Sequence, residues 1–334
     1  MGEIEEELEL IGVYFGASGL VEGAGTGARI LKKEAMLSGA FLDGGDVTLD
    51  EPAETSVLEQ VIEVSELTRE RSAAVFERGD VPFVIGGDHS TAFGNIAAAC
   101  EHFGPEGVGV VYLDAHCDMN TPETSPTGNL HGMPMAALMG YGDPRWCAVA
   151  RRRLLPENVL LLGARSIDPG ERVFVREHGI KVVPLQPVPA VAAVPAVAAV
   201  PEPVEGVEAV EGPVLALIDR FIEERGIRHL HLSIDIDVLD PELVPGTGVP
   251  VPNGISEETY MAIIRHVAAL PILCSLDIVE YIPSLDKGDV TKRLCLETIR
   301  QIGESRRGMR IRKRDSGDAD PGSAEAKGAK RINA

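Results

Sequence analysis

The sequence predicts an α/β fold, namely a three-layer α/β/α sandwich with a mostly parallel sheet. Short apolar runs rich in Val, Leu and Ile recur along the chain, and they are too short for free-standing helices but typical of buried parallel strands. Segments with helical spacing lie between these runs, so strand and helix alternate as they do in βαβ units. Three of the runs end in histidines and aspartates. Because ligands bind beyond the carboxyl ends of strands in open α/β sheets, these ends also predict where a functional site lies.

The expected strands are apolar runs that polar or glycine-containing segments bound on both sides. They lie at residues 8–15, 82–85, 108–113, 159–163, 180–183, 229–236 and 272–279. The run at 229–236 reads HLHLSIDI and alternates with a period of two, which is the period of an extended chain.

The expected helices carry apolar residues three and four positions apart. In residues 54–78, Val57, Val61 and Val64 share one side. Ser256 is expected to cap the helix that begins with it. The other helices are expected at residues 28–37, 91–100, 133–139, 171–178, 214–225, 256–270 and 290–302.

A single domain is expected over residues 1–303, interrupted at about 185–212. The interrupting segment contains VPAVAA twice in succession, and its regularly spaced prolines forbid a continuous helix or a central strand. We interpret it as an extended, low-complexity surface insertion. Residues 304–334 are charged and poor in apolar side chains, so we expect a disordered tail there.

The composition excludes some classes of partner. The formal net charge of -21 disfavours nucleic acid and anionic membranes. The five cysteines form no CxxC pair, which indicates reduced thiols in a reducing compartment. The N-terminal sequence MGEIEEELEL is acidic and is neither a signal nor a transit peptide, so we expect a cytoplasmic protein.

The stretch DAHCD follows the apolar run at 108–113. In an extended chain, Asp114, His116 and Asp118 would project from the same side. Two carboxylates and an imidazole on one face are unfavourable together unless a cation lies between them. A metal ion is the simplest candidate for that cation.

Two further strand ends carry residues of the same kind. The run at 229–236 leads into Asp235 and Asp237, which share a side. Another run ends in GGDHS, where the glycines permit a sharp exit, His89 lies at the strand end and Ser90 is placed to cap the next helix. Together the three ends supply six candidate metal ligands: His89, Asp114, His116, Asp118, Asp235 and Asp237.

The ligand types indicate which metal such a site would hold. An EF-hand over DIDVLD fails, because Asp240 stands at position six and Gly246 at position twelve. Structural zinc is disfavoured, since no cysteine pairs with the histidines. Four carboxylates and two imidazoles favour Mn²⁺, with Mg²⁺ as an alternative. Single polar residues at a strand end are commonly unrelated to metals, but three such ends are hard to reach by chance.

Four motifs, in this order, resemble those of the ureohydrolase family: GGDHS at 86–90, DAHCDMN at 114–120, SIDIDVLDP at 233–241 and DIVE at 277–280. They span nearly the whole chain apart from the insertion and the tail. The loop at 120–132 is most similar to that of the arginases within this family. The resemblance implies an arginase-like fold and a homotrimer or homohexamer.

The resemblance also implies a reaction. Two Mn²⁺ ions per subunit would hydrolyse L-arginine to L-ornithine and urea, through attack of a metal-bridging hydroxide on the guanidinium carbon. One ion would be held by His89, Asp114, Asp118 and Asp235, and the other by His116, Asp114, Asp235 and Asp237. Besides Asp118, the implied catalytic residues are Glu280, which would pair with the guanidinium, and His131, which would shuttle a proton.

Six residues are implied at the other end of the substrate. Four neutral hydrogen-bonding side chains match the contacts to the α-carboxylate, and two acidic ones match the surroundings of the α-amino group. They are Asn120, Ser125, Thr127 and Asn129 for the carboxylate, and Asp168 and Glu171 for the amine. Agmatine has no carboxylate, so such a site should disfavour it.

The chain departs from the usual arginase pattern at a few positions. Ser166 stands where an aspartate is frequent, and Val249 stands where a threonine is common. These departures leave other substrates open, namely agmatine, guanidinobutyrate, another guanidino acid or formimidoylglutamate. A catalytically inactive binding protein and a two-metal deacetylase are further alternatives. The intact ligand set argues against the first and Glu280 against the second.

Overall fold

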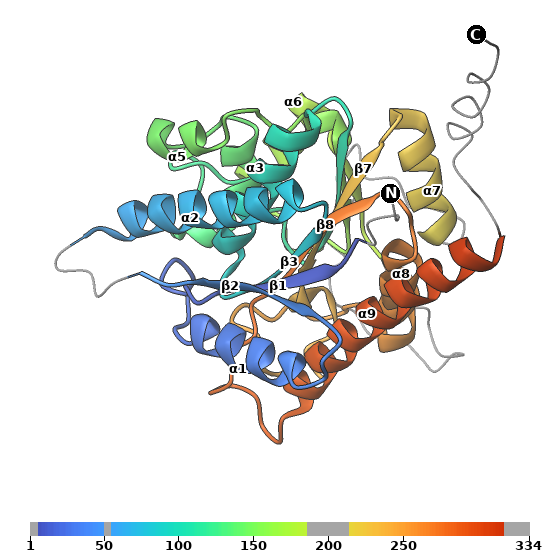
Figure 1. Ribbon diagram of the computed structural model, residues 1–334. Helices are drawn as coiled ribbons and strands as arrows, with labels where there is room; N and C mark the ends of the chain where they lie inside the picture. Colours follow the sequence, from blue (N-terminus) through green and yellow to red (C-terminus); the bar gives the residue numbers. More distant parts are fainter. Residues whose placement is uncertain (1–5, 50–54, 186–213, 317–334) are drawn as a thin grey trace, which may run out of the picture.

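The computed structural model describes residues 6–49, 55–185 and 214–316. Within them, eight strands form one sheet whose neighbouring strands are all parallel, with helices on both faces (Figure 1). The predicted α/β/α sandwich is therefore confirmed. The expected insertion at 185–212 lies, except for its first residue, outside the described residues, as do residues 317–334.

The strand order brings the predicted ligand-bearing strands together. The strands are β1 (Leu8–Val13), β2 (Leu42–Val47), β3 (Val81–Gly86), β4 (Val108–Leu113), β5 (Val159–Leu162), β6 (Lys181–Val183), β7 (His229–Asp235) and β8 (Leu273–Val279). Their order across the sheet is β2-β1-β3-β8-β7-β4-β5-β6. The adjacent strands β3, β8, β7 and β4 form its centre, so the polar stretches that follow them meet at one edge.

The helices form two layers (Figure 1). They are α1 (Ala24–Met36), α2 (Val57–Glu77), α3 (Ala92–Phe103), α4 (Pro134–Leu138), α5 (Pro144–Val149), α6 (Pro169–His178), α7 (Val214–Arg225), α8 (Glu257–Ala268) and α9 (Val290–Ser316). Buried side chains of α1, α7, α8 and α9 join one hydrophobic cluster, and those of α2 to α6 join the other. As predicted, Ser256 caps α8 by accepting the backbone N–H of Thr259.

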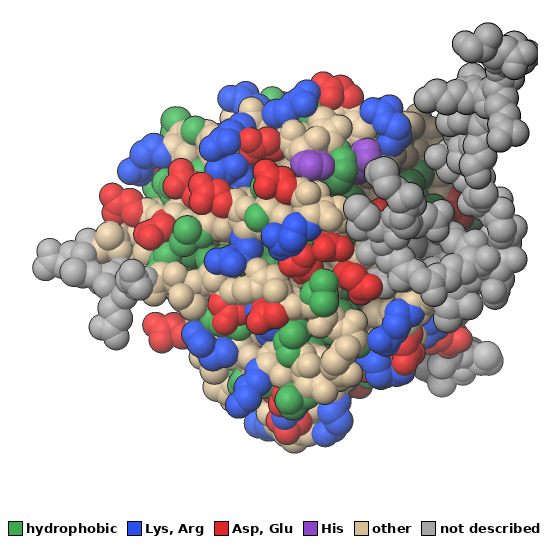
Figure 2. Space-filling model, in the orientation of Figure 1, with side chains coloured by type: hydrophobic (Ala, Val, Ile, Leu, Met, Phe, Trp, Pro, Cys, Tyr) green, Lys and Arg blue, Asp and Glu red, His purple; other side chains and the backbone are tan. Residues whose placement is uncertain are grey.

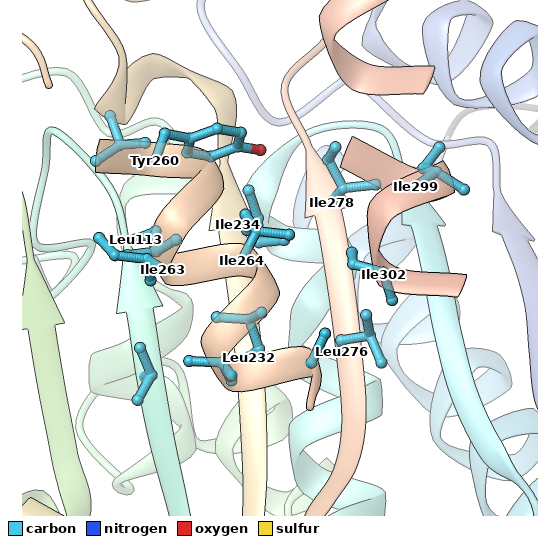
Figure 3. Packing of buried hydrophobic residues seen from close by; sticks show 14 of the residues in the cluster. Leu113, Leu232, Ile234, Tyr260, Ile263, Ile264, Leu276, Ile278, Ile299 and Ile302 are labelled. Atoms are coloured by element: carbon cyan, nitrogen blue, oxygen red, sulfur yellow. The ribbon is translucent and has the colours of Figure 1, made fainter. Parts of the chain in front are cut away.

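The cluster beneath α8 and α9 anchors the two central strands. Figure 3 shows Leu232 and Ile234 of β7 beside Leu276 and Ile278 of β8, with isoleucines of α8 and α9 packed over them. These four strand residues are at most 1% exposed. Burial of such side chains stabilises each by roughly 1.5–3 kcal/mol, which fixes β7 and β8 firmly relative to one another.

Three elements at the N-terminal half differ from the prediction. β2, with the sequence LDGGDV, is an edge strand whose glycines and aspartates give no strand signal, and the short α5 was also missed. Helix α1 begins at Ala24 instead of residue 28. Gly27 lies within this helix, and the position requires glycine because a Cβ there would lie 1.9 Å from the carbonyl oxygen of Tyr281. The glycines thus permit close packing, in addition to a flexible loop.

The expectation of disorder from residue 304 is wrong for residues 304–316, because α9 continues to Ser316. Arg300 forms ion pairs with Glu297 and Glu304, three and four positions away, and Ile302 is fully buried. Charges at this spacing stabilise a helix, although their composition alone is typical of disorder.

The surface carries charges of both signs. Acidic and basic side chains are interspersed over the face shown in Figure 2. Among the described residues, none of the helices has the length and apolar character needed to cross a membrane.

Candidate metal centre

The turn after β3 brings His89 to the edge of the sheet. Gly87 approaches the chain after β1 so closely that a Cβ would lie 1.5 Å from the carbonyl oxygen of Phe15. Asp88, rather than the expected Ser90, caps the short helix that follows, because its carboxylate accepts the N–H of Ser90 at 3.1 Å. His89 is thereby held with only 1% of its surface exposed.

The three ligand-type residues after β4 lie on a chain whose conformation differs from the predicted extended one. The strand ends at Leu113, so the stretch that follows is not extended throughout. Asp118 has a left-handed backbone with φ of 54°, which turns its carboxylate back toward His89. The predicted convergence of Asp114, His116 and Asp118 is found, but a turn rather than strand periodicity produces it.

Three of the aspartates are anchored in the same way. Each uses Oδ1 to accept a backbone N–H, and each leaves Oδ2 beside an imidazole. Asp114 accepts from His116 at 2.6 Å, Asp235 from Asp237 at 2.8 Å, and Asp237 from Ala115 at 2.9 Å. The last of these bonds ties the ends of β4 and β7 together, and the Oδ2 atoms of the three carboxylates face His89 or His116.

The polar atoms gather around two centres. Nδ1 of His89 lies 3.0 Å from Oδ2 of Asp114 and 3.2 Å from Oδ2 of both Asp118 and Asp235. Nδ1 of His116 lies 2.9 Å from Oδ2 of Asp237 and 3.4 Å from Oδ1 of Asp114.

These atoms define two candidate metal sites that share Asp114: His89, Asp114 and Asp235 form one, and Asp114, His116 and Asp237 form the other. Asp118 lies beside the first site. Asp235 falls in the first of these groups, and the bridging role that the resemblance implies for it stays a prediction.

The crowded charges shift the protonation of these groups. Burial, followed by the charges of Asp237 and Asp118, raises the pKa of Asp114 to about 6. Burial and the charge of Asp237 also raise the pKa of Asp235 well above its ordinary value. Burial alone would lower the pKa of His89, but the three surrounding carboxylates outweigh it and raise that pKa well above normal. The cluster therefore has an excess of negative charge that a cation would relieve.

The donor set fits a pair of divalent cations. Nδ1 of His89 and Oδ2 of Asp114 are both fully buried and form no hydrogen bond, although they lie close together. Buried polar atoms without partners are rare, and here both are aimed into a group of carboxylates. Oxygen-rich sites with imidazoles suit Mn²⁺ and Mg²⁺ better than soft metals.

A cleft of about 200 Å³ opens above the carboxylates. His116, Asp118, Asp235 and Asp237 form its floor, and His131 and Glu280 stand beside them. Oε1 of Glu280 lies 3.0 Å from Nδ1 of His131 and accepts the backbone N–H of His89 at 2.9 Å. Glu280, the first residue after β8, has a left-handed backbone with φ of 69°.

The protonation of His131 follows from this pairing. Burial would lower the pKa of His131, but its bond to Glu280 and the charges of Glu280 and Asp118 raise it to about 9. In the absence of a competing ligand, the imidazole is therefore charged at neutral pH.

All six residues predicted for the far end of the substrate line the same cleft: Asn120, Ser125, Thr127, Asn129, Asp168 and Glu171. The side-chain amide of Asn120 donates to Asp168 at 2.9 Å. Glu171 is 3% exposed and accepts the backbone N–H groups of Met119 and Asp168, while burial raises its pKa to about 7. Glu171 thus braces the cleft wall and also caps α6.

Sequence reasoning did not assign several residues that the structure brings to the site. Leu20 and Val249 are the only side chains of Val, Leu or Ile type that line the cleft within the described residues. Leu20 comes from a glycine-rich loop and carried no signal. Ser233 lies directly behind His89, and His231 follows beyond Asp277; the period of two in HLHLSID could have placed both on the side of Asp235.

Known proteins are similar to this chain in sequence. Residues 10–303 match the Arginase family. The arginase of Brevibacillus brevis is 34% identical over 301 residues, which cover 87% of this chain and 92% of that protein. The arginase of Bacillus caldovelox is 37% identical over 242 residues, which cover 72% and 74%.

Solved structures share the fold. The Entamoeba histolytica arginase in complex with L-ornithine has a TM-score of 0.73 and 31% identity, covering 89% of this chain and 98% of that one. A formimidoylglutamase from Bacillus subtilis, with 19% identity and a TM-score of 0.65, shows the fold alone. From its matched residues and these relatives, the chain belongs to the arginase family of ureohydrolases.

Proposed function

We propose that this ureohydrolase is a manganese-dependent arginase, which hydrolyses L-arginine to L-ornithine and urea. The observation that carries the proposal is the composition of the cleft from one end to the other. Its floor holds the two candidate metal sites with Glu280 and His131, and its opposite wall holds four neutral hydrogen-bonding side chains with two acidic ones. A substrate that has a guanidinium at one end and an amino acid group at the other matches both.

Each end of the cleft suits one end of L-arginine. Glu280 is a buried carboxylate, which pairs strongly with a planar guanidinium cation. Ser125, Thr127 and Asn129 can donate to a carboxylate, and Asp168 can accept from an ammonium group. Relatives named arginase, at 34% and 37% identity, support the same substrate.

The chain's own residues perform the binding and the proton transfer. When bound, divalent cations lower the pKa of water enough to supply hydroxide at neutral pH. The substrate guanidinium competes with His131 for Oε1 of Glu280. Loss of that partner lowers the pKa of His131 from about 9 toward its ordinary value, so the imidazolium can release its proton to the leaving amine nitrogen.

The test is urea release by the purified, Mn²⁺-loaded protein, with L-arginine and agmatine offered in parallel at equal concentration. We expect a strong preference for L-arginine. Glu280→Gln is the matched control, since it should retain bound Mn²⁺ but lose most activity. A preference for agmatine would refute the assignment of the carboxylate-binding wall. Urea from neither substrate, with metal shown to be bound, would refute the arginase proposal and direct the search to formimidoylglutamate and other guanidino acids.

A further inference from the structure

A line of buried side chains extends from His89 into the sheet, away from the cleft. Nε2 of His89 lies 2.9 Å from Oγ of Ser233, and that hydroxyl donates to Oδ1 of Asp277 at 2.6 Å. Oδ2 of Asp277 lies 2.7 Å from Nε2 of His231, whose Nδ1 lies 2.7 Å from Oγ of Ser275. The four residues behind His89 are all 0% exposed.

The register of β7 and β8 creates this line. Ser233 is the partner of Asp277 across the two strands, and His231 is the partner of Ser275. The period of two places His231 and Ser233 on the side of β7 that also carries Asp235. With His89, the line contains three buried titratable groups, and such groups are costly unless each has partners, as His231 and Asp277 have here.

The chemistry of the donors fixes the direction of the bonds that lead from His89 through Ser233 to Asp277. The single hydroxyl proton of Ser233 is used for Asp277. Ser233 can therefore only accept from His89, and Nε2 of His89 must carry a proton.

With Nε2 protonated, Nδ1 is the ring atom of His89 left to bind a metal. This atom is the one that faces the carboxylates of Asp114, Asp118 and Asp235, and it has no hydrogen bond. The bond at Nε2 also restricts rotation of the ring, because Ser233 lies on a strand in the centre of the sheet.

We propose that Ser233 and Asp277, the latter held by His231, are positioning residues that fix the tautomer and orientation of His89 and so hold Nδ1 as a ligand for one of the two cations. Partners of this kind on a ligating histidine typically contribute 10- to 100-fold in metal affinity. The second site has no equivalent in the contacts recorded for the described residues. The ring of His116 makes its ion-pair contacts through Nδ1 only and is 21% exposed toward the cleft.

The inference rests on the metal part of the proposed function and does not depend on the substrate. It is tested by titrating the metal-free, full-length protein with Mn²⁺ alone, using calorimetry for the affinities and electron paramagnetic resonance to separate single ions from coupled pairs. Ser233→Ala should weaken one of the two Mn²⁺ affinities by about 10- to 100-fold and leave the other within about 3-fold. Ser233→Thr keeps the hydroxyl and should restore both affinities.

Two further variants keep the test decisive. Asp277→Asn can donate toward Ser233, which removes the fixed direction of the bonds, and it should reproduce the effect of Ser233→Ala. Ser275→Ala is the matched control, because it removes an equally buried bond at the far end of the line without changing the bonds of His89. Thermal melting of each metal-free variant establishes that it is folded.

The possible results distinguish a positioning role of Ser233 and Asp277 from a general loosening of the sheet. Loss of one affinity in Ser233→Ala and Asp277→Asn, with rescue by Ser233→Thr, supports the inference. Equal weakening of both sites, or an equal effect of Ser275→Ala, would overturn it in favour of general loosening of the sheet, and unchanged affinities would overturn it directly. If the unmodified protein binds no Mn²⁺, the proposed function itself fails.

Discussion

The floor and the rim of the cleft are built in different ways. On the floor, Asp235 and Asp237 are each 3% exposed, and the carboxylate of Asp237 accepts the backbone N–H of Ala115, which is 122 positions away. On the rim, Ser125 and Thr127 lie in a loop in which they accept N–H groups from residues two or three positions away. The floor is therefore tied across the ends of the adjacent strands β4 and β7, whereas these rim contacts are local to one turn.

This difference separates chemistry from substrate choice. Burying several carboxylates together is unfavourable and is tolerated only where the fold supplies many anchors and a cation. Ser125 and Thr127 on the rim are half-buried or exposed and can change without disturbing the sheet. Floor residues should therefore govern whether any reaction occurs, and rim residues should govern which guanidino compound reacts.

The largest effect is expected for Asp114→Asn, which alters the aspartate shared by both candidate sites. We expect activity to fall by more than about 100-fold, since a ligand contributes more than its hydrogen-bond partners do. The metal-free variant should nevertheless be more stable than the unmodified protein near neutral pH, by up to about 3 kcal/mol. Burial and neighbouring charges raise the pKa of Asp114 to about 6, so its ionisation lowers stability increasingly as the pH rises from the unfolded pKa of roughly 3.9 and in full above about 6.

Metal content, activity and urea denaturation of the metal-free protein check this prediction. His116→Asn is the matched control, because His116 belongs to one candidate site only. It should lower the Mn²⁺ content from two ions to one per chain. Full activity in Asp114→Asn, or a metal-free form less stable than the unmodified protein, would contradict the role given to the floor.

The central part of the fold could be predicted because its signals are local. Runs such as 108–113 are apolar enough to be strands only in a buried parallel sheet, and the predicted bounds agree with β4. Edge strand β2 could not be predicted, since LDGGDV is stabilised by pairing with β1 and not by its own residues. Helix α9 was predicted too short because ion pairs at helical spacing and disordered charge have the same composition.

The candidate site was predictable as a set of residues but not as a geometry. The chain's order places His89, Asp114 and Asp235 after three strands, and parallel pairing then brings them to one edge. The left-handed turns at Asp118 and Glu280 depend on tertiary contacts that no local pattern records. The pairing of His131 with Glu280 likewise joins segments 149 positions apart.

His131 and Glu280 lie between the floor and the rim of the cleft. We expect the loss of their pairing to have an effect of intermediate size on the free energy of unfolding. The folded pKa of His131 is raised to about 9, so the stabilisation is fully present below its unfolded pKa of roughly 6.5 and is lost as the pH rises through about 9. We expect the metal-free protein to exceed His131→Asn in free energy of unfolding by up to about 3 kcal/mol at pH 6, with the difference shrinking toward pH 9.5. Urea denaturation at several pH values measures it.

Glu280→Gln is the control for that pH dependence, because it removes the negative charge while keeping the shape of the side chain. It should flatten the pH dependence without removing the imidazole. A difference between the unmodified protein and His131→Asn that grows with pH would contradict a charged His131.

The smallest effects are expected for residues on the rim. There, the roles of two residues can be distinguished by comparing L-arginine with agmatine. Asn129 lines the side assigned to the α-carboxylate, and Leu20 is an apolar residue that also lines the cleft. We expect Asn129→Ala to lower kcat/KM for L-arginine by about 10-fold, the value of one hydrogen bond to a charged group, and to leave the weak reaction with agmatine within about 2-fold.

Leu20→Ala should instead lower kcat/KM for both substrates equally, by about 3- to 10-fold, because it removes apolar contact with the methylene stem that they share. Steady-state urea release with both substrates distinguishes the two variants. Equal losses on both substrates for Asn129→Ala would show that this residue shapes the loop and does not bind the carboxylate. The rim would then be as dependent on its own fold as the floor is, and the proposed division between chemistry and substrate choice would have to be abandoned.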